Sequence, residues 1–285
     1  MNILTFDIEE WFHILDHHDD WLAFSNWNNL ESRVEELTEK LLMLLKLEEV
    51  HATFFIVGWV AKKFPNLVRL IHSHGHEIAS HSHYHRLCYE LNWRSFSDDL
   101  QLSLNVLEDI IGEKVTTYRA PGFSVIKEST WVLEALRMNG ILNDCSIFSA
   151  SRRHGGMLDW DYREPFIIET QFGDLCEFPM SYARVFKKRL VFSGGGYLRI
   201  TPKPLLTYLF KKLDYNMVYM HPRDYDKEQP VIKSLPRFRR LKHYVGIGSS
   251  YQKLQSLLKN DFVTVAQANE LLNSKLINRV TLNDN

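Results

Sequence analysis

The sequence predicts one α/β domain with a mostly parallel sheet, because strand-like and helical segments alternate along most of its 285 residues. Short apolar or β-branched runs typical of buried strands lie at 2–7, 52–57, 76–79, 116–118 and 217–220. No internal repeat, low-complexity segment or strong linker divides the chain. We therefore expect a single domain over residues 1–285.

Segments with apolar residues at helical spacing separate these strands. The expected helices cover 30–47, 67–74, 97–111, 128–138, 202–213 and 251–258. Ser97 is the expected N-cap of the third of these. Residues 13–29 and 224–243 are expected to be irregular, and 193–196 to form a flexible turn because they contain three glycines.

Composition excludes several classes of partner. The formal net charge of -1, from 34 basic and 35 acidic residues, supplies no field for a polyanion, so no nucleic-acid partner is expected. Cys88, Cys145 and Cys176 are scattered, which argues for reduced thiols. No signal peptide is visible, and the longest aliphatic run, 41–45, is too short for a transmembrane segment. We therefore expect a cytoplasmic location.

Polar residues gather where four predicted strands end. Asp7 and Glu9 end the first, the segment 81–85 follows the third, Arg119 follows the fourth, and His221 follows the strand at 217–220. The C-terminal ends of barrel strands form the catalytic face, so these side chains are expected to meet.

The types of these residues indicate hydrolysis of an amide or ester. His81 and His85 are four apart, a spacing that places both rings on one face of a helical turn, and two imidazoles with one carboxylate suit zinc and other divalent metals. A second carboxylate could act as the general base for water, and Arg119 could keep that base ionised. His221 could protonate a leaving group.

Four segments carry a resemblance to a known family. Residues 5–9, 81–85, 119–123 and 219–221 resemble, in order, the motifs of polysaccharide deacetylases, the NodB-homology class of carbohydrate esterases. The resemblance implies an irregular (β/α) barrel with about seven strands. It also implies a divalent metal, expected to be zinc, and an amino-sugar or oligosaccharide substrate. Residues 237–248 resemble a subgroup associated with exopolysaccharide and O-antigen assembly.

The resemblance implies a role for each matching residue. Asp7 is the base, His81 and His85 are metal ligands, and His221 is the general acid. Arg119 pairs with Asp7, and the amide N–H of Gly122 stabilises the oxyanion. The predicted substrate-binding residues are Trp11, Phe123 and Asp144, of which Asp144 is also a candidate anchor for Arg119.

The first motif departs from the family pattern of two adjacent aspartates. Here Ile8 follows Asp7, and the next acids are Glu9 and Glu10. Strand alternation places Glu9 beside Asp7, so Glu9 is the predicted metal ligand and Glu10 is the alternative. The remaining nearby histidines, expected to be surface residues, are His13, His17, His18 and His83.

Two other functions remain open at this point. One is a metal-free hydrolase of the same fold that acts on a cyclic amide or ureide. The other is a catalytically silent glycan-binding module in which the altered first motif has lost turnover. The prediction that we follow is a metal-dependent hydrolase that removes an N-acetyl group from an amino sugar of a bacterial surface polysaccharide or its precursor.

Overall fold

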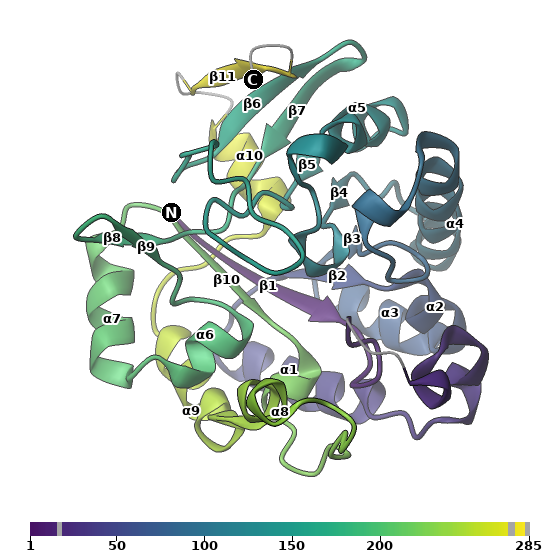
Figure 1. The fold of residues 1–285 in the computed structure, drawn as a ribbon, viewed down its shortest axis with the longest axis vertical. Helices are drawn as coiled ribbons and strands as arrows, with labels where there is room; N and C mark the ends of the chain where they lie inside the picture. Colours follow the sequence, from purple (N-terminus) through teal and green to yellow (C-terminus); the bar gives the residue numbers. More distant parts are fainter. Residues whose placement is uncertain (16–18, 273–276, 283–285) are drawn as a thin grey trace.

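The computed structural model describes residues 1–15, 19–272 and 277–282, and a nine-stranded sheet organises them (Figure 1). The strand order is β10-β1-β2-β3-β4-β5-β7-β6-β11. The strands β1 (Asn2–Ile8), β2 (Thr53–Ile56), β3 (Glu77–Ser80), β4 (Thr117–Tyr118), β5 (Asn143–Asp144), β7 (Gly173–Glu177) and β10 (Asn216–Met220) are mutually parallel. The expectation of a mostly parallel sheet is confirmed.

The remaining strands extend or flank this parallel array. β6 (Phe166–Thr170) runs antiparallel to β7, and β11 (Arg279–Thr281) pairs with β6. A separate hairpin consists of β8 (Ala183–Val185) and β9 (Lys188–Leu190).

Ten α-helices lie in the described residues, and several cover the sheet (Figure 1). They are α1 (Val34–Leu47), α2 (Gly58–Lys63), α3 (Pro65–Ser73), α4 (Trp93–Ile111), α5 (Trp131–Met138), α6 (Gly195–Ile200), α7 (Lys203–Lys212), α8 (Arg237–Tyr244), α9 (Ile247–Leu257) and α10 (Val265–Leu272). Single-turn 3₁₀ helices are found at Asp20–Leu22, Cys88–Glu90, Pro121–Phe123, Lys127–Ser129 and Pro222–Asp224, with a longer one at Phe24–Asn29.

β1 lies between β10 and β2, which brings strands from opposite ends of the sequence, β1 and β10, together (Figure 1). Residues 3–8 are all buried, as expected for a strand covered on both faces. Phe6 pairs with Met220 on one side and Phe54 on the other. Asp7 follows Phe6 and His221 follows Met220, so this register brings Asp7 and His221 to the same level at the ends of two adjacent strands.

The start of one helix differs from the prediction, because the spacing of apolar residues took no account of a capping side chain. α4 begins at Trp93 rather than Ser97, because Asn92 and Ser95 form a capping box: the Asn92 side chain accepts from Ser95 N–H at 3.0 Å. The short helix α2 was not expected.

Two segments expected to be irregular are partly helical. α8 begins at Arg237, within 224–243, and α6 begins at Gly195, within the glycine-rich segment. The glycines there are required by packing: a Cβ on Gly194 would lie 1.9 Å from Cε1 of Tyr219. Gly194 therefore makes room for the Tyr219 ring.

The three cysteines are buried and free of disulfides. No helix in the described part of the chain is long and apolar enough to cross a membrane.

Candidate active site

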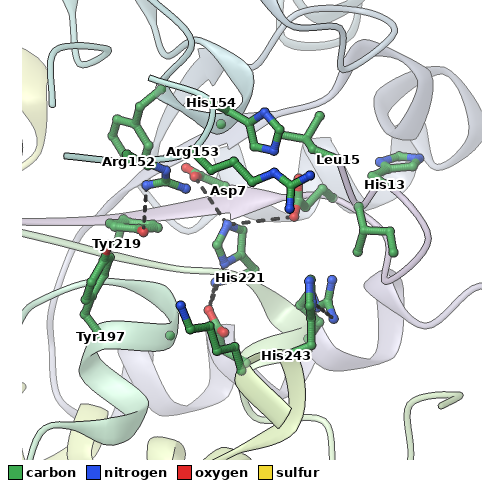
Figure 2. A pocket seen from close by; sticks show the side chains of 18 of the residues that line it. Asp7, His13, Leu15, Arg152, Arg153, His154, Tyr197, Tyr219, His221 and His243 are labelled. Carbon is green, nitrogen blue, oxygen red and sulfur yellow. Dashed lines mark hydrogen bonds and ion pairs between the residues drawn. The ribbon is translucent and has the colours of Figure 1, made fainter. Parts of the chain in front are cut away.

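The strand ends converge on one cavity of about 580 Å³ (Figure 2). Its lining includes Asp7 and Glu9 from the end of β1, His81 and His85 after β3, and His221 after β10. The sequence prediction that these side chains meet is confirmed by this lining. Arg119, after β4, lies behind the cavity wall and is completely buried.

Glu9, His81 and His85 form a candidate metal centre. One ligand atom from each lies within 4.8 Å of the other two, and all three side chains are buried. Glu9 Oε2 lies 2.6 Å from His85 Nε2. His81 Nδ1 is 2.8 Å from the carbonyl oxygen of Arg119, so it donates there and leaves Nε2 as the free acceptor.

The ionisation of this triad suits a divalent metal. Burial lowers the pKa of His81 to about 4, so its imidazole is neutral and can ligate. Burial alone would raise the pKa of Glu9, but the imidazoles of His85 and His221 lower it instead. Two histidines and one carboxylate are a donor set that binds zinc-type metals with open positions.

The histidine segment is a tight turn rather than a helical turn. Ser82 and His85 have φ of 65° and 53°, which non-glycine residues rarely adopt, and such strain persists only where surrounding contacts fix it. Asp99 of α4 supplies two of them, because its carboxylate accepts from His83 N–H at 2.8 Å and Tyr84 N–H at 3.2 Å.

Asp99→Ala is expected to lower metal affinity about 10–100-fold, the usual effect of losing a group that positions a ligand. The alanine frees two backbone N–H groups, so the strained turn loses its support. Titration of the apo-protein with zinc measures the effect. The matched control is Asp98→Ala, which removes an exposed acid one residue earlier in α4. An equal loss in both variants would contradict the positioning role of Asp99.

Glu10, the alternative metal ligand, lies elsewhere. Its carboxylate accepts from Ser32 Oγ and from the backbone N–H groups of Arg33, at 3.1 Å, and Val34, at 3.5 Å. It therefore neutralises the N-terminus of α1. The residue does not line the cavity, so the geometry favours Glu9.

Asp7 is held by a fully buried guanidinium. Arg119 NH1 donates to Asp7 Oδ1 at 2.6 Å and to Thr5 Oγ1 at 2.8 Å, and its Nε donates to the carbonyl of Cys145. Burial opposes the charge on Arg119, but Asp7 outweighs it and raises the arginine pKa. The ion pair fixes the orientation of the Asp7 carboxylate, as a general base requires.

His221 faces the same carboxylates from the opposite side of the cavity (Figure 2). Its Nε2 lies 3.7 Å from both Asp7 Oδ2 and Glu9 Oε1, while Nδ1 donates to Asp224 Oδ2 at 2.8 Å. Burial alone would lower the pKa of His221, but Asp224 and Glu9 raise it to about 9. His221 is thus protonated at neutral pH and can deliver a proton.

Asp224 is itself fixed as a carboxylate. Its Oδ1 lies 3.0 Å from Arg199 Nε, and its Oδ2 also accepts from His221 N–H at 2.9 Å. Burial would raise the pKa of Asp224, but His221 and Arg199 lower it to about 2.

The predicted substrate-binding residues do not all line the cavity. Phe123 and Gly122 line the cavity, whereas Trp11 does not. The indole Nε1–H of Trp11 donates to the Glu31 carbonyl at 2.9 Å, and the ring packs against Phe12 and Trp21, so the ring belongs to the hydrophobic core.

Asp144 also differs from the prediction: it is fully buried, does not line the cavity, and is not a hydrogen-bond partner of Arg119. Its Oδ1 accepts from Ser146 Oγ at 2.5 Å, and it faces Glu177 across the β5–β7 pair. Burial raises the pKa of both carboxyls, and Asp144 raises that of Glu177 further. The protonated form of Glu177 is therefore favoured, and its proton would face the Asp144 carboxyl on the neighbouring strand.

Glu177→Gln is expected to flatten the pH dependence of stability. The folded pKa values of the Asp144–Glu177 pair exceed the unfolded ones, so their stabilising effect is complete at pH below about 4 and is lost as pH rises through about 6 and above. A glutamine keeps a donor to Asp144 without a proton to lose. Melting temperature measured from pH 5 to 9 should fall less in Glu177→Gln than in wild type, and exposed Glu164→Gln should follow wild type. Parallel curves for all three proteins would contradict this account.

Two histidines expected on the surface are buried. His13 and His83 are 2% and 3% exposed. His13 Nδ1 accepts from Glu10 N–H at 3.3 Å, the ring packs on Trp27 and lies beside His85, and burial lowers its pKa well below the ordinary value. The other two, His17 and His18, lie outside the described residues.

Asp99 and Asp224 are functional candidates that the sequence reasoning missed. Asp99 falls on the buried stripe of α4 with Phe96 and Leu100, and an acid on an apolar stripe is a detectable signal. Asp224 follows His221 by three residues, within reach of Nδ1 if a turn forms there. Neither acid stands in a motif that the resemblance covers.

The fold and the triad define a parallel α/β barrel-type protein with a candidate metal centre at the C-terminal ends of its strands. Residues 13–141 match the family model of polysaccharide deacetylases, and residues 145–270 match a domain of unknown function, DUF3473. An assigned polysaccharide deacetylase from Mycobacterium smegmatis has the same fold, with a TM-score of 0.66 and 20% identity over 98% of this chain and 92% of that one. Residues 13–141 are thus similar to polysaccharide deacetylases, and the predicted barrel-type fold is confirmed.

Two further matches are to an enzyme and to a pseudoenzyme. A peptidoglycan-N-acetylglucosamine deacetylase of Bacillus cereus is 31% identical over 100 residues, which are 35% of this chain and 36% of the relative. A CE4 family pseudoenzyme from Bacillus anthracis shares the fold with a TM-score of 0.50 and 15% identity, over 94% of this chain and 64% of that one. The chain thus spans about a third of the length of the curated relatives it matches.

Proposed function

We propose that this protein is a metal-dependent hydrolase that removes the N-acetyl group from an amino sugar. The observation that carries the proposal is the placement of the Asp7 carboxylate and a protonated His221 beside the Glu9–His81–His85 triad. A carboxylate that can act as base and an imidazolium that can act as acid, next to a metal site, are what amide hydrolysis requires.

Each side chain then has a distinct task. Glu9, His81 and His85 hold a divalent metal, with zinc the first expectation, which when bound lowers the pKa of water and polarises the acyl oxygen. Asp7 accepts a proton from the attacking water, and Arg119 holds Asp7 in place. His221 Nε2–H protonates the departing nitrogen, while Asp224 keeps Nδ1 as a donor.

The backbone of Gly122 adds a donor for the developing negative charge. Gly122 lines the cavity at φ +63°, and its N–H donates to no other group in the described chain. An N–H aimed at the acyl oxygen stabilises the oxyanion more than the ground-state carbonyl. Phe123, with its ring against Tyr219 at 5.0 Å, forms the adjacent apolar wall.

The other two functions fit the site less well. A metal-free hydrolase has no need of three convergent metal-type donors, and a silent binding module has no need of the Asp7–Arg119 and His221–Asp224 pairs. The resemblance of residues 237–248 adds a bacterial surface glycan or its precursor as the proposed source of the amino sugar.

The purified protein is expected to release acetate from N-acetylglucosamine derivatives, and a chelator is expected to stop the release until zinc is restored. The substrates to compare are monosaccharides, sugar nucleotides and oligosaccharides, and enzymatic quantification of acetate is the measurement. Turnover that survives complete removal of metal would favour the cyclic-amide hydrolase. Saturable glycan binding with no acetate from any substrate would favour the silent module.

A further inference from the structure

The cavity carries more positive than negative side chains. Among the described residues, its lining contains six arginines and lysines but three acids: Arg152, Arg153, Arg199, Arg223, Arg239 and Lys242 against Asp7, Glu9 and Asp224. Arg199 pairs with Asp224, and Arg153 and Arg239 have other contacts. Arg152, Arg223 and Lys242 are the cations of the lining that have no task in the proposed hydrolysis itself.

Arg223 is the clearest part of this surplus. It is only 9% exposed, and no carboxylate of the described chain lies within ion-pair distance. Its NH2 group is 3.2 Å from His243 Nδ1, and burial together with Arg223 lowers the pKa of His243 to about 3, so that ring is neutral. Glu9 and Asp224 favour the charge of Arg223 without direct contact, but burial outweighs them and lowers the pKa of Arg223. An anion in contact with this guanidinium would replace its lost hydration.

Arg152 approaches the cavity from a different segment. Its NH1 donates to Tyr219 Oη at 3.2 Å, and the guanidinium stacks 4.7 Å from the Phe123 ring and 5.0 Å from the Phe148 ring. These contacts orient the charge without neutralising it. Gly194 allows this arrangement, because any larger residue would displace the Tyr219 ring.

Lys242 is the third cation, on α8. Its Nζ lies 4.6 Å from the Phe238 ring and has no carboxylate within ion-pair distance in the described chain. Figure 2 shows His221 between Arg152 and His243. Arg152, Arg223 and Lys242 line the same cavity as His221, the proposed acid.

We infer that the substrate carries a phosphoryl group, which Arg152, Arg223 and Lys242 bind beside the amino sugar. The inference rests on the proposed function for the sugar. Three cations without carboxylate partners call for more than one negative charge, and a phosphate ester supplies about 1.5–2 at neutral pH. Guanidinium forks match phosphate oxygens, and a lysine adds a point charge. A sugar phosphate and a diphosphate-linked sugar share this chemistry.

Binding of glucose 1-phosphate to the zinc-loaded protein tests the site independently of hydrolysis, because this probe has no amide. Calorimetry should show it binding at least about tenfold more tightly than glucose. Arg152→Gln and Lys242→Gln should each weaken it about tenfold, the scale of one hydrogen bond to a charged group. Arg237→Gln, an exposed cation of α8 outside the cavity, should not.

Equal affinity for glucose and its phosphate would overturn the inference. So would an equal loss in Arg237→Gln, or binding that requires zinc but is indifferent to Arg152 and Lys242, since the phosphate would then lie on the metal. Arg223→Gln is informative only if its melting curve matches wild type, so the decision rests on the other two variants.

Acetate release then identifies the source of the phosphoryl group. We expect kcat/KM for N-acetylglucosamine 1-phosphate or uridine diphosphate N-acetylglucosamine to exceed that for uncharged N-acetylated oligosaccharides by at least about tenfold. A preference for the uncharged oligosaccharides or for the carboxylate of N-acetylmuramic acid would overturn the inference. If no substrate releases acetate, the proposed function fails, and the glucose 1-phosphate result still decides whether the anion site exists.

Discussion

Asp7→Asn is expected to retain bound metal and to lose at least about 10²-fold in kcat on an N-acetylated amino sugar, the usual scale for a general base. The asparagine oxygen can still accept from Arg119 NH1, which lies 2.6 Å from Oδ1 in the wild type, so the side chain should stay in place. Its amide cannot take a proton from water. Elemental analysis and acetate-release kinetics on the same preparation separate the two effects.

Glu9→Gln provides the contrast, since it should weaken metal binding as well as turnover. His85 and His221 lower the pKa of Glu9 and so keep its carboxylate negatively charged, and metal binding requires this charge. Glu10→Gln should keep the metal, because Glu10 is bonded to the first turn of α1. If Asp7→Asn loses metal while Glu9→Gln keeps it, the two roles are reversed.

The sequence predicted the strand ends well, because each was an apolar run followed directly by a chemically distinctive residue. In a parallel sheet those ends share one edge, so Asp7, His81 and His221 could be brought together without knowing the helices. The preference for Glu9 over Glu10 followed from strand alternation, although β1 ends at Ile8 and both acids lie beyond it.

Contacts between segments that lie far apart in the sequence could not be predicted from the sequence. The Asp99 carboxylate of α4 accepts hydrogen bonds from the histidine turn at 81–85, and no local sequence pattern in either segment predicts these bonds. The resemblance implied Asp144 as an anchor for Arg119, but Asp144 is paired in register with Glu177 of β7, and this pairing depends on the path of the chain between β5 and β7. Burial of Trp11 and His13 depends on the irregular segment that covers them.

The second large effect is expected at His221. An amine is a poor leaving group unless protonated, whereas an aryl ester leaves as a weakly basic phenolate. His221→Ala should therefore lower amide hydrolysis roughly 10²–10⁴-fold and leave activated-ester hydrolysis much less affected. Nδ1 of His221 donates to Asp224, and Nε2 lies 3.7 Å from carboxylate oxygens of both Asp7 and Glu9. The proton available for transfer is therefore the one on Nε2, which faces the cavity.

The pH dependence of kcat/KM distinguishes proton donation from positioning. Because Asp224 and Glu9 raise the pKa of His221, the imidazolium persists through neutral pH, and loss of its proton should lower wild-type amide hydrolysis at alkaline pH. The acid-side fall should report the base. His221→Ala should abolish the alkaline fall while the acid-side fall remains, since Asp7 is unchanged. An equal loss on amide and aryl ester with both limbs intact would mean that His221 positions the substrate, and the proton would then have to come from another group in the cavity.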